Sequence, residues 1–205
     1  SFEWRHKILA AIRALEGGIS FSGIVEADEL LMKYSEKGRK FKNKEEYRKA
    51  KKKKHPKVAV LVVTDREGNL LFKQVGEKKV KNEQLREELK SRLSENNLIC
   101  VKPKKEFRKG IKGLQSKKVI VNKRQLKRGI YSVKIVENKI SDFKTWLSRF
   151  HGVATKYLQS YLMWFVIMNK YLKELINPDI GRLLNLSSHD RWAWDKYREI
   201  ISQRY

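Results

Sequence analysis

The strongest constraint on the fold is an almost unbroken aliphatic run, Val58 to Asp65, with the sequence VAVLVVTD. Its β-branched residues and its short length favour a buried strand over a helix. The next residues, DREGN, carry turn chemistry into a second apolar run, Leu70 to Val75. We therefore predict a hairpin whose strands belong to a central sheet, with Asp65 serving its turn.

A second predicted strand carries acidic residues. In the β-branched segment Ile19 to Leu31, alternation places Ile24, Glu26 and Asp28 on one face of the strand. Two carboxylates on one face of a core strand are unusual because burying a charge is costly unless it is paired. This face is therefore a candidate functional site.

Helices are predicted before and after these strands in the sequence. Apolar residues recur at helical spacing in four segments, and one further short strand is expected between the second and the third. The pattern predicts an α/β fold in which helices flank a mixed sheet, followed by a helical carboxyl-terminal piece. The helices are predicted over Phe2–Leu15, Asn82–Leu93, Glu137–Phe150 and Ala154–Ile176, and the strand over Leu98–Val101.

The charge of the chain points to a polyanionic partner. Its 48 Lys and Arg residues outnumber its 23 Asp and Glu residues, which gives a net charge of +25 at pH 7. A positive field of this size attracts nucleic acid. The basic residues concentrate in two segments, Lys33–Lys57, interpreted as a loop or disordered arm, and Lys102–Arg128, interpreted as a second basic surface. No stretch has the length and apolarity of a membrane span, and the single Cys100 suits a reducing cytoplasm.

Several strings resemble the catalytic domain of insertion-sequence DDE transposases of the ISXO-like group. They are FEWRHKIL from Phe2, VEADE from Val25, YSEKG from Tyr34, TDREGN from Thr64, and KTWLSRFHGVATKYLQSYL from Lys144. The resemblance implies an RNase H-like mixed sheet with flanking helices and a helical extension. We accordingly divide the chain into an amino-terminal helix over residues 1–18, a catalytic domain over 19–172 with a basic insert at 33–57, and a helical tail over 173–205.

The resemblance also implies a set of catalytic acids. Asp28 of the VEADE string matches the first acid of the family, and Glu137, seven residues before Lys144, matches the third. The second acid aligns with Val101, which cannot bind a metal ion, so catalysis is expected to be impaired. An intact family member is expected to hold two Mg²⁺ (or Mn²⁺) ions at these acids for strand cleavage and strand transfer. Glu26 and Glu29 are interpreted as supporting or surface acids.

The implied partner is double-stranded DNA, both the element ends and the target, and a homo-oligomer is expected on the DNA. The full-length family also carries a zinc ribbon and a helix-turn-helix before the WRHK string, and neither is in the sequence given, so an amino-terminal truncation that lacks sequence-specific end recognition is expected. The protein is expected in the cytoplasm, associated with the nucleoid. A noncatalytic, basic nucleic-acid-binding protein derived from a decayed transposase is the alternative function. The residues predicted to contact DNA are Lys51, Lys52, Lys53, Lys54, Arg108, Lys109, Lys123, Arg124, Lys127, Arg128 and Lys144, of which Lys144 is equally compatible with a solvated helix face.

Overall fold

A five-stranded mixed sheet forms the centre of the protein, whose computed structural model describes residues 2–13, 17–52, 54–122, 124–171, 195 and 198. The strand order is β3-β2-β1-β4-β5. β1, β2 and β3 pair antiparallel, whereas β4 runs parallel to β1, and β5 runs parallel to β4. This order confirms the predicted α/β, RNase H-like fold. The strands are β1 (Ile24–Met32), β2 (Val58–Asp65), β3 (Leu70–Glu77), β4 (Leu98–Val101) and β5 (Lys117–Ile120).

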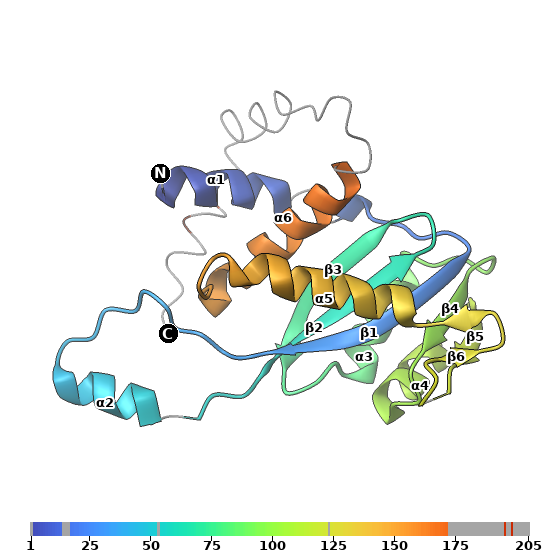
Figure 1. Ribbon diagram of the computed structural model, residues 1–205, viewed down its shortest axis with the longest axis horizontal. Coiled ribbons are helices and arrows are strands. Elements are labelled where there is room, and N and C mark those ends of the chain that lie inside the picture. The colour runs from blue at the N-terminus through green and yellow to red at the C-terminus, as the bar shows by residue number, and fades with distance from the viewer. Residues whose placement is uncertain are drawn as a thin grey trace.

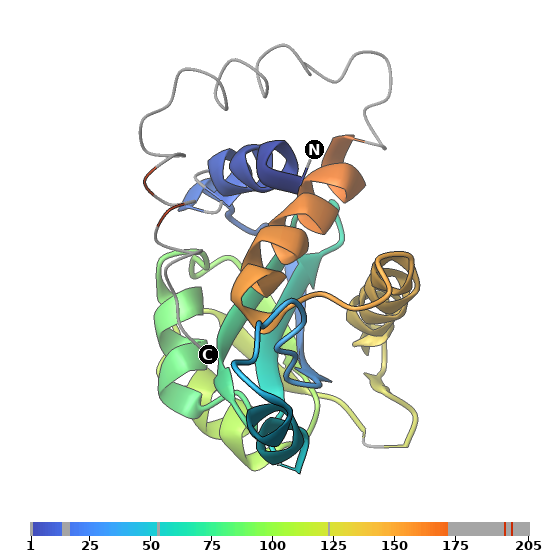
Figure 2. The same ribbon diagram turned by 90° about the vertical axis from the view of Figure 1, so that its left-hand side faces the viewer.

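Helices cover both faces of the sheet, as Figures 1 and 2 show. On one face, α3 (Asn82–Lys90) and α4 (Lys105–Lys112) bury Leu85 and Phe107 against Val25 and Ala27 of β1. On the other face, α5 (Lys134–Ser148) and α6 (Leu158–Tyr171) pack apolar side chains onto β1, β2 and β3. A short 3₁₀ helix, Thr155–Tyr157, leads into α6. Because strand side chains alternate between faces, β1 contributes to two separate apolar clusters.

The predicted hairpin is present, and Asp65 closes its turn. Its carboxylate accepts hydrogen bonds from the backbone N–H groups of Ser22, Gly68 and Asn69 at 2.9–3.0 Å. It also accepts one from the side-chain amide of Asn69 at 2.6 Å. Donors from the loops at the end of β2 therefore satisfy this buried carboxylate, which confirms the predicted role of Asp65 in the turn.

Two regions contain elements that the sequence did not predict. The segment Lys33–Lys57, expected to be a loop or disordered arm, contains helix α2 (Lys44–Lys52), although none of its residues is buried. Local capping explains this helix: the side chain of Asn43 accepts the N–H of Glu46, and the Glu46 carboxylate accepts the N–H of Lys42. The second basic segment likewise contains α4 and strand β6 (Lys127–Arg128), which pairs with β7 (Tyr131–Ser132).

The predicted carboxyl-terminal tail, 173–205, lies outside the described residues except for positions 195 and 198. Within the described part of the chain, no helix combines the length and the apolarity that a membrane crossing requires.

Helix α1 (Phe2–Arg13) joins the body of the protein through α6. Its residues Leu9 and Ile12 pack with Tyr161 and Met163 of that helix. His6 is 3% exposed, and its ring centroid lies 4.0 Å from that of Tyr157. Burial, reinforced by the positive charges of Arg5 and Lys156, lowers the pKa of His6 to about 4.

This pKa generates a prediction about acid stability. Between about pH 6.5 and pH 4, the unfolded chain binds a proton at His6 while the folded chain does not, so the free energy of unfolding should fall as the pH decreases. The loss should reach at most about 3 kcal/mol, because each tenfold change in proton affinity contributes about 1.4 kcal/mol. Urea unfolding of the native protein and of His6→Phe at several pH values measures this loss in the free energy of unfolding. An equally steep pH dependence in His6→Phe would contradict this assignment.

Candidate functional site

A buried carboxylate, Glu26, attaches α5 to the central strand. Glu26 is fully buried on β1, and its Oε2 accepts the backbone N–H groups of Ile135 at 2.9 Å and Val136 at 3.1 Å. Its Oε1 accepts the hydroxyl of Ser132 at 3.2 Å. Because no side chain at the start of α5 caps the helix locally, Glu26 satisfies N–H groups of its first turn from another element. Burial raises the pKa of Glu26, although these hydrogen bonds oppose the shift.

This attachment brings Asp28 and Glu137 to the same place. Asp28 follows Glu26 on the same face of β1, and Glu137 lies in the first turn of α5. Both line a cavity of about 470 Å³, together with Glu29, Lys102, Lys104 and Lys144 among others. The two acids that the sequence predicted as catalytic thus converge, although 109 positions separate them in the chain.

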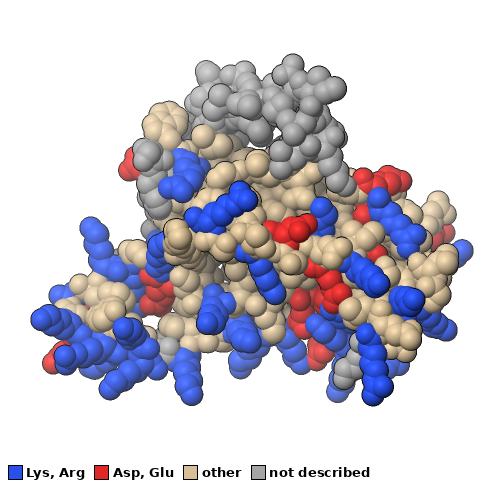
Figure 3. Space-filling model, in the orientation of Figure 1, with Lys and Arg blue, Asp and Glu red and all other residues tan. Residues whose placement is uncertain are grey.

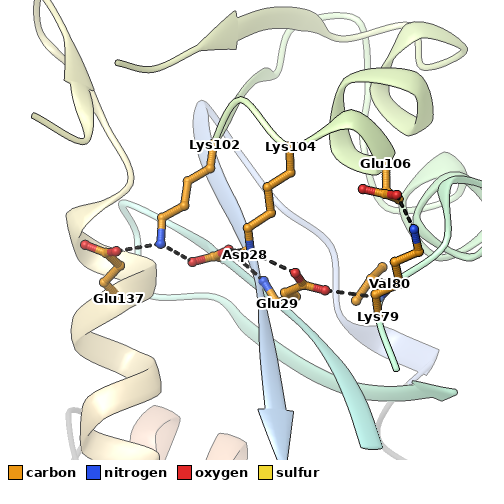
Figure 4. Close-up of polar contacts among 8 residues, drawn as sticks. All are labelled: Asp28, Glu29, Lys79, Val80, Lys102, Lys104, Glu106 and Glu137. Carbon is orange, nitrogen blue, oxygen red and sulfur yellow. Dashed lines mark hydrogen bonds and ion pairs between the residues drawn. The ribbon is translucent and has the colours of Figure 1, made fainter. Parts of the chain in front are cut away.

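Two lysines that the sequence analysis did not select occupy the space around these acids (Figure 4). The Nζ of Lys102 lies 2.5 Å from Oδ2 of Asp28 and 2.6 Å from Oε1 of Glu137. The Nζ of Lys104 lies 3.2 Å from Oδ1 of Asp28 and 2.8 Å from Oε1 of Glu29. Oδ1 of Asp28 also accepts the backbone N–H of Glu29 at 2.8 Å. Both oxygens of Asp28 are therefore already bound by donors of the protein itself.

The contacts of Lys102 with the two acids favour its charged form. Burial alone would lower the pKa of Lys102, but its hydrogen bonds and charge attraction to Asp28 and Glu137 raise the pKa overall. Its side chain is 21% exposed, and that of Asp28 is only 5% exposed. A buried carboxylate is stable only when it is paired, so the ammonium group of Lys102 compensates the charge of Asp28.

Val101 does not face the site that contains Asp28. Val101 is fully buried in the cluster that Ala27, its partner in β1, forms with α3 and α4, on the face of the sheet away from Asp28. Extending this parallel register by one residue places Lys102 beside Asp28. The residue beside Asp28 is therefore Lys102, and Val101, which the family resemblance aligns with the second acid, points to the opposite face of the sheet. Only the register of β4 beside β1 shows which residue lies next to Asp28, because successive residues of a strand point to opposite faces of the sheet.

The donor set does not fit the two-ion site that the family resemblance implies. Within the described residues, no three His, Cys, Asp or Glu side chains are grouped to hold a metal ion. Glu106, the nearest acid after β4, pairs with Lys79 instead (Figure 4), and this contact lowers the pKa of Glu106. Two ions would need carboxylate oxygens shared between them. In this site, the ammonium groups of Lys102 and Lys104 contact the carboxylate oxygens instead.

The predicted DNA-contacting residues are exposed wherever they are described. Figure 3 shows Lys and Arg side chains along the lower edge of that view, from α2 at the left to the region of α4 at the right, with acidic side chains between. Two of the predicted residues, Lys53 and Lys123, lie outside the described part of the chain. The exposed ones are Lys51, Lys52, Lys54, Arg108, Lys109, Arg124, Lys127, Arg128 and Lys144.

The strand order, with acids from the central strand β1 and from α5 lining one cavity, places the protein in the class of RNase H-like domains. The sequence pattern of the ISXO2-like transposase domain matches residues 20–167. The chain therefore belongs to this transposase family. A chain in a crystal structure of a pre-cleavage Mos1 transpososome is similar at a TM-score of 0.34 and 11% sequence identity, with 92% of this chain and 62% of that chain covered. No curated protein matches the sequence.

The role of Glu26 can be tested by its effect on stability. Glu26→Ala leaves the N–H groups of Ile135 and Val136 without their acceptor, and a buried unpaired donor costs about 1–3 kcal/mol. We expect the free energy of unfolding to fall by about 3 kcal/mol in Glu26→Ala, but by about 1 kcal/mol in Glu26→Gln, which keeps an acceptor oxygen. Urea unfolding measures both. Equal losses in the two variants would show that the carboxylate charge, rather than helix capping, stabilises α5.

Proposed function

We propose that this transposase-family protein binds double-stranded DNA by its phosphate backbone, along the face that contains the cavity between β1 and α5, without cleaving the DNA. The observation that carries the proposal is the set of cations inside this cavity. Lys144 is exposed and lines the same cavity as Asp28 and Glu137, and Lys102 and Lys104 already neutralise two of its acids. A phosphate can therefore approach at Lys144 with reduced repulsion from the carboxylates.

The basic surface continues along α5. At the carboxyl-terminal end of this helix, a second cavity of about 600 Å³ is lined by four basic side chains, Arg5, Lys37, Arg149 and Lys156. At 1.5 Å per residue, Glu137 and Arg149 lie about 18 Å apart along the helix. A DNA backbone that follows α5 would contact positively charged side chains at both ends of this helix. The exposed lysines of α2 extend this surface on the side of the second cavity (Figures 1 and 3).

Binding of this kind depends on salt in a measurable way. Each Lys–phosphate contact releases a counterion, so Lys144→Ala should weaken duplex binding and reduce the slope of log affinity against log salt by about one. Fluorescence anisotropy with a labelled duplex over a salt series measures the slope. Lys90→Ala, an exposed lysine of α3 on the other face of the sheet, loses the same charge and should leave the slope unchanged. Equal changes in the two variants would show that only net charge matters.

A second function, strand cleavage and strand transfer, is favoured by the convergence of Asp28 and Glu137 in one cavity. The lysines bound to these acids oppose it. We expect the native protein to leave supercoiled plasmid uncut in the presence of Mg²⁺ or Mn²⁺, as followed by agarose gel electrophoresis. Cleavage that requires the ion and disappears in Asp28→Ala would establish the second function and reject the noncatalytic one.

A further inference from the structure

The ammonium group of Lys102 lies where two carboxylates from separate elements converge. Its distances of 2.5 Å to Asp28 and 2.6 Å to Glu137 are those of two close, charge-assisted contacts. Asp28 belongs to β1 and Glu137 to α5, so this one side chain joins the central strand to the helix. Figure 4 shows it extending from the loop after β4 to both acids.

The backbone gives Lys102 this direction. It directly follows β4, where Val101 pairs with Ala27, and it precedes Pro103. A residue before proline is restricted to extended conformations because the proline ring clashes with it in the helical region. The chain therefore continues the alternation of β4 for one more residue. Lys102 is directed to the same face as Cys100, which packs in the cluster beneath α5.

The charges that line the cavity are balanced without any added ion. Asp28, Glu29 and Glu137 contribute three negative charges, and Lys102, Lys104 and Lys144 contribute three positive charges. The first two lysines contact all three acids. A divalent cation placed between Asp28 and Glu137 would have to displace the Lys102 ammonium or lie beside it. A divalent cation beside the Lys102 ammonium would be repelled strongly, because two positive charges would lie close together in a partly buried site.

We propose that Lys102 is the resident cation of this site and takes the place of the divalent ions that the family resemblance implies. It holds Asp28 and Glu137 together and makes the site independent of metal ions. The inference concerns the same cavity as the proposed function and adds to it the identity of the neutralising group. Its test contains no DNA, so either conclusion can fail without the other.

The experiment is a titration of Mn²⁺ alone into the full chain, followed by calorimetry and by the electron paramagnetic resonance signal of free Mn²⁺. The native protein should show no binding that depends on Asp28. Lys102→Asp replaces the cation with an oxygen ligand and should bind Mn²⁺ at least about tenfold more tightly. Lys105→Asp is the matched control: it makes the same change of charge at an exposed position of α4 and should bind no better than the native protein.

A measurement of stability accompanies the titration. Mn²⁺ should raise the melting temperature of Lys102→Asp and leave those of the native protein and Lys105→Asp unchanged, because only an ion bound to the folded state stabilises it. Asp28→Asn added to Lys102→Asp should abolish the gain. Tight Mn²⁺ binding by the native protein that Asp28→Asn removes would overturn the proposal, and this outcome can be observed whether or not Lys102→Asp folds. Equal binding by Lys102→Asp and Lys105→Asp would overturn it as well.

Discussion

The hydrogen bonds from the first turn of α5 to Glu26 support the geometry of the whole site. A helix packed on a sheet by apolar contacts alone can slide or rotate, because such contacts are not directional. Hydrogen bonds to a buried carboxylate are directional, and here one side chain of β1 accepts from Ile135, Val136 and Ser132. Asp28 lies two residues further along the strand, and Glu137 lies one residue beyond Val136. The anchoring contact therefore sets the separation of the two acids.

The same cavity combines this fixed geometry with an internal balance of charge. The protein carries a net charge of +25, yet three acids gather in one place between β1 and α5. Lys102 and Lys104 extend from the loop between β4 and α4 to contact all three. Their contacts join β1, α5 and this loop. The cost of breaking them is high for Asp28, whose carboxylate is almost fully buried and would lose its compensating charge.

The strands and the buried helices could be predicted because their signals are local. The run Val58–Asp65, the turn after it and the spacing of Leu85 and Leu89 agree closely with β2, the hairpin and α3. Helix α2 was missed because it buries no residue, so its stability comes from capping and ion pairs such as that between Arg39 and Glu46 rather than from apolar periodicity. α4 was missed because basic residues surround its short apolar stripe.

The amino-acid sequence was sufficient to indicate the family, the mixed sheet and the two acids Asp28 and Glu137, because family strings and hydrophobic period are properties of the chain itself. It was not sufficient to decide between Val101 and Lys102 as the neighbour of Asp28. Successive residues of a strand point to opposite faces, so an alignment shifted by one position exchanges a core residue for a residue of the site. That choice depends on the pairing of Ala27 with Val101, a contact between residues 74 positions apart that forms only when the sheet assembles.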